Sequence, residues 1–501
     1  MAEAASSNQE SLIGSNRLDG FATRYFTVLV WVVLGVAALN LFFALTTETV
    51  AEWDESLYAL SATEMLDSGN WLVTTFDGKV DYYNSKPPLN VWILALSFKV
   101  LGTHLLSLRL VAALAAWTTV LVLIRWAKQL YGPTVALLAG LVLSTTFGFL
   151  HVHSGRSGNP DALMTLLMLL IVVTTWAGLW RGWALSALGP LLAGVFLLKG
   201  MAVLMPLTFV GVVLTWRLIA GRRPIAWRPL AVAGILFAAP ALSWAVARWQ
   251  SDGWQFLSLL VTQDLITAAT TPLDGHHAPL YYYATVLQRF QYDWLLAGLV
   301  VVVLQRRLIW QSALKLFRTP QLADDGTVMV LAWAALTFGV PSIMQTKLAW
   351  YLNPFYPVFA LSLGWLLNSG LCHSRSVRNR RIVAAVAVVA LLAAEAKLLW
   401  HPVNKRSLHG TTQELLMLSA DEARHRTVFA DDWTAAERFV LRGIVRATPA
   451  RVKDVDAFLQ LDVPKSLWLG DCDLNDARLE TVRTNGVESL YRRRSVVRPK
   501  E

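Results

Sequence analysis

Residues 26–46 read FTVLVWVVLGVAALNLFFALT and contain no charged side chain. A helix needs about 20 apolar residues to cross the hydrocarbon core of a bilayer, and this stretch has that length. It is too long for the hydrophobic part of a cleavable signal peptide, and it lacks a convincing small-residue cleavage site. We therefore interpret it as an uncleaved membrane anchor.

Similar apolar stretches recur along the chain and predict an all-α polytopic membrane protein with about 11–13 transmembrane helices. The higher of these two numbers allows for an extra pair of spans within 250–290. The eleven stretches lie near 26–46, 108–126, 134–150, 162–180, 183–198, 200–219, 229–248, 290–304, 328–344, 353–370 and 382–400.

The composition excludes a soluble protein. Of 501 residues, 55% are apolar and only 16% are charged, and the mean hydropathy is +0.46, whereas soluble domains are about 25% charged. The formal net charge of +10 does not indicate a nucleic-acid partner, because the basic residues sit in short loops between apolar stretches. Two cysteines, Cys372 and Cys472, exclude a disulfide framework and a Cys-based metal site.

Lysine and arginine fall in alternate loops, and cytoplasmic loops are the ones that carry them. This pattern predicts a cytoplasmic N-terminus, and an odd number of spans then places the C-terminal segment outside. The basic residues of the predicted inside loops include Arg24, Arg125, Lys128, Arg181, Arg217, Arg228, Arg306, Arg307, Arg378 and Arg381.

The outside face contains the segments that are not spans. The first long loop, 47–107, is predicted to form two interfacial helices at 55–68 and 89–101. The tail is charged and mixed, with strand-like runs at 428–430 and 466–469 and an amphipathic stretch at 435–446, which predicts a small α/β domain. We therefore divide the chain into a cytoplasmic segment 1–25, a transmembrane domain 26–400 and an extracytoplasmic domain 401–501.

Asp54 and Glu55 lie about eight residues beyond the first apolar stretch. Two interpretations are open. Asp54 suits a helix N-cap and Glu55 suits the positive first turn of the following helix. Alternatively, a carboxylate beside an apolar wall gains basicity through desolvation, and the pair is then a general base at the membrane surface.

Lys86 directly precedes a Pro-Pro pair that starts the second predicted loop helix. Proline in the first turn is an ordinary helix start. However, a lysine next to the positive end of the helix dipole is poorly placed as a structural cation and well placed to bind an anion.

The loop after the third stretch runs from His151 to Asp161. His151 and His153 form an H-x-H pair, but no third metal ligand is evident nearby. Arg156 and Asp161 either pair or cap the next helix, or line the same outer cavity as Asp54.

Two further lysines fall on the outside. Lys199 lies between two short stretches, where a charge is functional by default unless it reaches the surface. Lys347 lies in a predicted outside loop, although lysine and arginine are usually enriched in the cytoplasmic loops. Carboxylates and several cations at one membrane face suit a reaction on a phosphate-bearing lipid, in which cations hold the phosphate and a carboxylate deprotonates the attacking group.

The ordered set of motifs resembles the GT-C type glycosyltransferases that use polyprenyl-phosphate sugars. The similarity covers roughly residues 20–370. It is nearest to the bacterial lipid A aminoarabinose transferases and more distant to protein O-mannosyltransferases. The motifs are Asp54-Glu55-x-x-Tyr58, Phe76-Asp77-Gly78 with Lys86-Pro87-Pro88-Leu89, Arg156 to Asp161, Leu198-Lys199-Gly200, His277-Ala278-Pro279-Leu280-Tyr281-Tyr282-Tyr283, and Thr346-Lys347-Leu348-Ala349-Trp350-Tyr351-Leu352.

The resemblance implies an inverting transfer from undecaprenyl phosphate at the periplasmic leaflet of a bacterial inner membrane. The acceptor would be lipid A, lipopolysaccharide core or a protein, and a divalent metal is left open. The implied roles are catalysis by Asp54 and Glu55; donor-phosphate binding by Lys86, Arg289, Lys347 and Tyr351; and shaping of the acceptor cavity by Tyr58, Arg156, Asp161, Lys199, His277 and Tyr282.

Two features depart from the family pattern. Ala349 stands where the family usually has proline, and the His151-Val152-His153 stretch has no counterpart in the motifs. Two rival functions are a protein O-glycosyltransferase of the same fold and a lipid-linked sugar flippase or transporter. Transporters place ionisable groups near the bilayer midplane, whereas this chain collects them at one face, which favours an enzyme.

Overall fold

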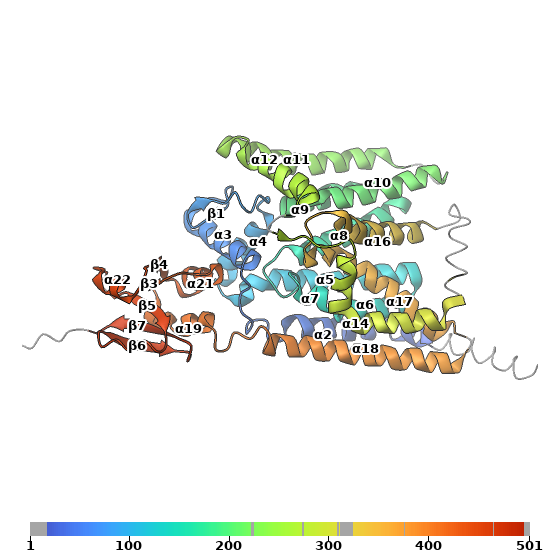
Figure 1. Cartoon of the computed structure of the whole chain (residues 1–501). Helices are drawn as coiled ribbons and strands as arrows, with labels where there is room; N and C mark the ends of the chain where they lie inside the picture. The colour runs from blue at the N-terminus through green and yellow to red at the C-terminus, as the bar shows by residue number, and fades with distance from the viewer. Residues whose placement is uncertain are drawn as a thin grey trace, which may run out of the picture.

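The computed structural model describes residues 18–221, 225–272, 275–307, 310, 324–374, 376–463 and 465–494. A bundle of long helices forms most of the molecule, and a smaller domain with a β-sheet lies at one end of it (Figure 1). We call this end the domain face. Residues 1–17 of the predicted N-terminal segment lie outside the described part of the chain.

The protein is a multi-pass membrane protein. Within the described ranges, eight helices are long and apolar enough to cross a membrane, or nine if Leu18–Arg24 and Phe26–Phe42 form one bent span. All eleven predicted stretches contain a helix. The bundle helices are α2 (Phe26–Phe42), α5 (Leu105–Tyr131), α6 (Pro133–Ser144), α8 (Asp161–Trp180), α9 (Leu188–Lys199), α10 (Leu204–Ile219), α11 (Trp227–Asp252), α14 (Tyr282–Leu304), α16 (Asp325–Ile343), α17 (Tyr356–Cys372) and α18 (Val377–Asn404).

The 38-residue helical stretch Gly182–Ile219 contains a chain reversal. At the end of α9, Lys199 pairs with Asp161, the first residue of α8. At the end of α10, the Arg217 guanidinium lies 6.0 Å from the ring of Trp180, the last residue of α8. The break falls at Gly200, whose φ of +54° favours glycine. The stretch therefore spans the bundle twice, as two separate short spans.

Small residues bring the central helices close together. Helix α6 packs against both α5 and α17. A Cβ added to Gly364 of α17 would lie 2.7 Å from the backbone nitrogen of Ala139 in α6. Such close contact is typical of membrane helix packing, because no hydrophobic force drives the helices together inside lipid.

The first long loop folds as predicted into two helices, α3 (Asp54–Ser68) and α4 (Leu89–Leu101), with a short hairpin between them. Helix α3 packs against α4 on the domain face.

In 250–290 the structure has short helices in place of an additional pair of spans. The other short elements are β1 (Thr75–Phe76), β2 (Lys79–Val80), α7 (Phe147–His151), η1 (Gly182–Ala187), η2 (Gly200–Val203), α12 (Gln255–Val261), η3 (Thr262–Thr267), α13 (Ala268–Thr270) and η6 (Ala349–Phe355).

The C-terminal domain contains a five-stranded mixed sheet in the order β4-β3-β5-β7-β6. Strand β3 pairs in parallel with β4 and β5, and β7 pairs antiparallel with β5 and β6. The predicted strands and helix are present as β3, β5 and α21 with η7. The domain's elements are α19 (Thr412–Leu418), α20 (Ala420–Ala423), β3 (Thr427–Ala430), α21 (Ala435–Phe439), η7 (Val440–Val445), β4 (Thr448–Arg451), α22 (Val455–Gln460), β5 (Leu467–Asp471), β6 (Leu479–Thr484) and β7 (Glu488–Arg493).

Polar contacts fix this domain on the first loop. The Gln413 side chain accepts a hydrogen bond from the Val50 backbone N–H at 2.8 Å and donates to its carbonyl at 3.0 Å. Arg442 pairs with Glu64 of α3 at 2.7 Å, and α21 packs on α3. The domain therefore covers the loop that carries Asp54 and Lys86.

Candidate active site

Asp54 is the first residue of α3, on the domain face. The N-cap position is Trp53, and no side chain makes a cap hydrogen bond there. The predicted capping role of Asp54 is therefore wrong. Its side chain is 40% exposed, and one carboxylate oxygen lies 3.6 Å from Nδ1 of His153. A partly exposed carboxylate that the helix start does not use is free to act on a bound molecule.

Lys86 lies two residues before Pro88, the N-cap of α4, and interacts electrostatically with Asp54. Its Nζ donates to Asn84 Oδ1 at 3.2 Å. Burial alone would lower the pKa of Lys86, but electrostatic interactions with Tyr58, Asp264 and Asp54 raise it above its ordinary value. The ammonium group therefore stays charged within electrostatic reach of Asp54 and Asp264, where it can bind an anion.

Asp264, in η3, completes this side of the site. One carboxylate oxygen accepts a hydrogen bond from Ser85 at 3.3 Å, and the other is buried without a partner. Burial raises the pKa of Asp264, although Lys86 opposes the effect. An unpaired buried carboxylate oxygen is costly and marks a place where a bound polar group would fit.

Asp161 and Lys199 form an ion pair at 2.6 Å. The pair joins the start of α8 to the end of α9, and the Lys199 ammonium lies 5.9 Å from the centre of the Tyr351 ring. Tyr351 interacts electrostatically with Lys86, Asp264 and Asp161. Lys199 thus has a partner that the sequence did not reveal, and Tyr351 connects the pair to Lys86.

Four other predicted site residues, two for the donor phosphate and two for the acceptor cavity, lie elsewhere. The Lys347 ammonium donates to the carbonyls of Ser342, at 2.9 Å, and Met344, where α16 ends. The His277 backbone bridges to Thr346. Arg289 is exposed on α14 and lies over the Phe290 ring at 5.3 Å, and Tyr282 is half-buried on the same helix, against Tyr283. Within the described ranges, no hydrogen bond, ion pair or ring contact joins these four to Lys86 or Asp54.

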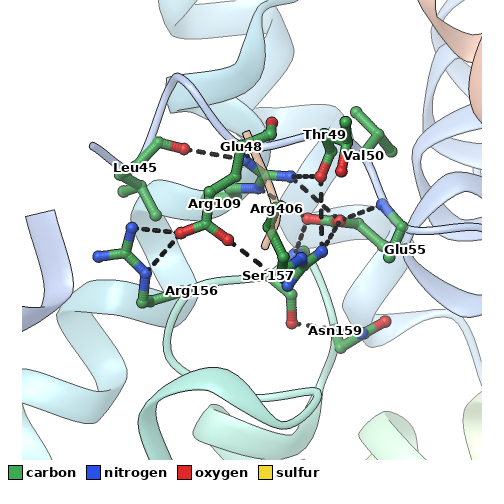
Figure 2. Close-up of polar contacts among 12 residues, drawn as sticks. Leu45, Glu48, Thr49, Val50, Glu55, Arg109, Arg156, Ser157, Asn159 and Arg406 are labelled. Atoms are coloured by element: carbon green, nitrogen blue, oxygen red, sulfur yellow. Dashed lines mark hydrogen bonds and ion pairs between the residues drawn. The ribbon is translucent and has the colours of Figure 1, made fainter. Parts of the chain in front are cut away.

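Glu55 belongs to a buried ion cluster that we define as Glu48, Glu55, Arg109, Arg156 and Arg406 (Figure 2). Glu55 binds Arg109 through both oxygens, at 2.9 and 3.2 Å. It also accepts from the Ala51 and Gly158 backbone N–H groups, at 2.8 and 2.9 Å. Burial would raise the pKa of Glu55, but Arg109 and Arg406 lower it to about 2.

Arg156 forms the other half of the cluster. Its guanidinium pairs with Glu48 and donates to the carbonyls of Asn40, Leu41 and Phe43 at 2.8, 3.0 and 2.7 Å. These carbonyls end α2, which otherwise has unpaired acceptors at its C-terminus. Figure 2 shows the Arg156 guanidinium directed toward the Glu48 carboxylate.

The sequence interpretation of Glu55 and Arg156 therefore requires correction. Both side chains are at most 1% exposed, and all the described contacts of these groups are internal. Adjacent residues of a helix point about 100° apart, so Asp54 faces open space while Glu55 faces the core. Glu55 and Arg156 hold the segments of the site in place and do not line the acceptor cavity.

A cavity of about 590 Å³ lies between the helix bundle and the C-terminal domain. His153, whose ring contacts Asp54, is one of the lining residues, so the cavity extends to this contact. The other lining residues are Thr49, Val50, Ala51, Glu52, Phe147, His151, Val152, Ser157, Asn159, Phe290, His401, Arg406, Thr411, Thr412, Gln413, Thr434 and Glu437. Within the described residues, no three His, Cys, Asp or Glu side chains form a group that could hold a metal ion.

Comparisons with known proteins agree with this geometry. A family model described as dolichyl-phosphate-mannose-protein mannosyltransferase matches residues 85–244. The crystal structure of ArnT from Cupriavidus metallidurans bound to undecaprenyl phosphate matches with a TM-score of 0.66 at 17% identity, over 93% of this chain and 98% of that one. The chain has the GT-C fold. The resemblance that the motifs indicated is confirmed.

Two further proteins are similar to this chain. The undecaprenyl phosphate-alpha-4-amino-4-deoxy-L-arabinose arabinosyl transferase of Edwardsiella ictaluri is 27% identical over 70% of this chain and 62% of its own length. An Archaeoglobus fulgidus oligosaccharyltransferase has a TM-score of 0.56 at 11% identity, over 85% of this chain and 64% of that one. The chain thus spans less than two thirds of the length of the first curated relatives.

Four residues of this GT-C protein were missed in the sequence. Arg109 stands at the start of an apolar stretch, where one charge is easily taken for a span boundary. Glu48 and Arg406 lie in loops without a motif, and Asp264 is a single acid in a mainly apolar segment. A lone charge beside an apolar run is the signal that could have drawn attention to Arg109 and Asp264, because burial makes such charges costly.

Proposed function

We propose that this protein is an integral-membrane, inverting glycosyltransferase whose donor is a sugar on undecaprenyl phosphate. The observation that carries the proposal is the position of Asp54. This partly exposed carboxylate lies in one constellation with the Lys86 ammonium and the Asp161–Lys199 ion pair. The names of the arabinosyl transferase relatives support this donor class.

The geometry suits displacement at the anomeric carbon. Asp54 orients the acceptor group, or takes its proton, as the bond to the sugar forms. The bond from the anomeric carbon to the donor phosphate breaks with its electron pair on the phosphate. Lys86 and the Tyr351 hydroxyl stabilise this leaving group. The described contacts do not support Arg289 and Lys347 as direct phosphate ligands. We therefore rank them below Lys86 and Tyr351 as candidates for this role.

We propose lipid A or lipopolysaccharide core as the acceptor, with protein as the alternative. The arginine and lysine distribution supports a cytoplasmic N-terminus and a periplasmic C-terminal domain in a bacterial inner membrane. The division into 1–25, 26–400 and 401–501 follows the same argument, since α18 ends at Asn404 and the sheet domain follows. The constellation at the domain face would then meet both substrates at the outer leaflet.

The decisive experiment compares donors. Purified protein in detergent should transfer 4-amino-4-deoxy-L-arabinose from its undecaprenyl-phosphate carrier to lipid A, and should not use the matching nucleotide sugar. Parallel reactions offer lipopolysaccharide core and periplasmic proteins as acceptors. Efficient transfer from the nucleotide sugar without lipid would contradict the proposal, as would movement of the donor across vesicles without sugar transfer.

Replacing Lys86 by Ala should weaken use of the lipid donor by about 10–100-fold. A charge-assisted hydrogen bond to phosphate contributes about 1.5–3 kcal/mol, and about 1.4 kcal/mol corresponds to a factor of ten. The measurement is kcat/KM for the donor. Lys99→Ala is the matched control, because Lys99 is exposed on the same helix α4. Equal values for the two variants would exclude Lys86 from the donor site.

A further inference from the structure

The loop between α7 and α8 carries His153 and is fixed on both sides. The Val152 carbonyl accepts a hydrogen bond from Asn353 at 3.1 Å. The Gly158 N–H donates to Glu55 at 2.9 Å, and the Gly158 carbonyl accepts from Asn90 at 3.2 Å. The loop is thus held by η6, α3 and α4, and the position of His153 relative to Asp54 is set by the fold.

The His153 ring is itself held in place. It stacks on Trp350 with ring centres 3.7 Å apart and planes 7° apart. Its backbone φ is +53°, and Trp53, which precedes Asp54, has φ of +67°. Residues with side chains rarely adopt this conformation, and such strain is concentrated at functional sites. His153 itself and Trp53, the residue before Asp54, are therefore both held in strained backbone conformations.

Asn159 is the hydrogen-bonding partner of the His153 ring. The Asn159 side-chain amide lies 3.1 Å from Nδ1 of His153 and also donates to Ser157 at 3.2 Å. With the amide assigned this way round, Nδ1 accepts and the ring proton sits on Nε2. The same Nδ1 lies 3.6 Å from the Asp54 carboxylate.

The charges around His153 come from three elements. Those that interact electrostatically with the ring are Asp54 and Glu55 of α3, Asp161 of α8 and Lys199 of α9. Burial is the largest effect and lowers the pKa of His153 below 6.5, although Asp161 and Asp54 oppose it. Trp350 contributes no charge. The ring is therefore neutral at pH 7 and gains a proton only in acid.

We propose that His153 is a positioning residue for Asp54, which rests on the proposed function. As a neutral ring whose Nδ1 accepts from Asn159, it offers the Asp54 carboxylate no N–H group, so Asp54 stays free to act on the substrate. As a cation it would present an N–H group, bind Asp54 as an ion pair and withdraw it from the reaction. Sugar transfer should therefore fall as His153 becomes protonated.

The pH dependence of His153→Gln tests this role. For the wild-type protein, kcat should decline with an inflection below pH 6.5. The His153→Gln variant should lose that inflection and show a kcat about 10-fold lower at pH 7.5, with KM changed by less than about 3-fold, since a positioned group contributes less than a general base. His425→Gln is the control, because His425 also has a positive φ, of +60°, but is exposed in the C-terminal domain, away from the site. An unchanged kcat and inflection in His153→Gln would overturn the inference.

A second measurement is independent of turnover. In protein labelled with ¹³C-histidine, NMR should show the His153 titration moving to lower pH in Asp54→Asn, because the carboxylate that favours the charged ring is lost. The His151 signal should not move. A His153 titration that ignores Asp54→Asn would overturn the inference even if no sugar transfer were detected. Absence of transfer by the wild type, with the expected NMR shift, would count against the proposed function alone.

Discussion

Asp54→Asn should lower the turnover of sugar transfer by about 10²–10⁴-fold, the range typical of losing a general base. Asn keeps the size and shape of the side chain but cannot take up the proton or carry the charge. Asp54 makes no cap hydrogen bond, and Asn is as well tolerated as Asp at helix starts, so α3 should stay folded. The measurement is kcat with the undecaprenyl-phosphate donor, at equal amounts of protein in the membrane.

Asp67→Asn provides the control for this variant. Asp67 is exposed near the other end of the same helix, so its replacement changes the same charge without touching the site. Transfer by Asp67→Asn should match that of the wild type. Near-normal turnover in Asp54→Asn would remove Asp54 from the reaction and leave the Asp161–Lys199 pair as the next candidate.

Arg109→Met should destabilise the protein by about 3–5 kcal/mol, the usual cost of breaking a buried ion pair from one side. Glu55 is fully buried, and it would keep its charge without its main partner. Arg109 also donates to the carbonyls of Leu45, Glu48 and Thr49, at 2.8, 3.0 and 2.7 Å, and these would lose that donor. The measurement is the midpoint of thermal unfolding in detergent.

Two further variants make this result specific. Arg125→Ala removes an exposed arginine from the same helix α5 and should leave the midpoint unchanged. The double variant Arg109→Met with Glu55→Gln should be more stable than Arg109→Met alone, because no unpaired charge remains. A double variant less stable than the single one would show that the ion pair is not the source of the effect.

The pKa of Glu55 sets the pH range of this contribution. It is lowered from 4.5 to about 2. A lowered acid pKa means that the ion pair's stabilisation is complete above pH 4.5 and is lost as the pH falls toward 2. The thermal unfolding experiments can therefore be made anywhere from pH 5 to 8 without changing the state of this pair.

Hydropathy predicted the helices well, because length and apolarity are properties of a local stretch. The spans on either side of Lys199 are an instructive case. Each is short, yet the sequence separated them at Lys199, and the fold reverses there. The strands β4, β6 and β7 were not predicted, since each is only four to six residues long and short strands carry little periodic signal.

The candidate site could be predicted from the sequence only in part. Asp54, Lys86 and Asp161 could be selected from motifs, and the structure brings them together. The roles of Glu55 and Arg156 could not, because the direction of a side chain depends on the rotation of its helix against the rest of the fold. Arg109 and Glu55 are far apart in sequence, and their pairing is decided by how α3 and α5 pack. The same holds for Arg406, which lies in the segment after α18.

The buried ion cluster has a consequence for how the chain is made. Glu48 and Glu55 leave the ribosome with the first loop, Arg109 with the following span and Arg156 after the third. These four can neutralise one another while most of the protein is still unsynthesised. Arg406 arrives only after the last span, where it lies 3.6 Å from Glu48 and 3.8 Å from Glu55. Its arrival couples completion of translation to the docking of the C-terminal domain, so a chain cut short before residue 406 should insert its early helices yet leave the site uncovered.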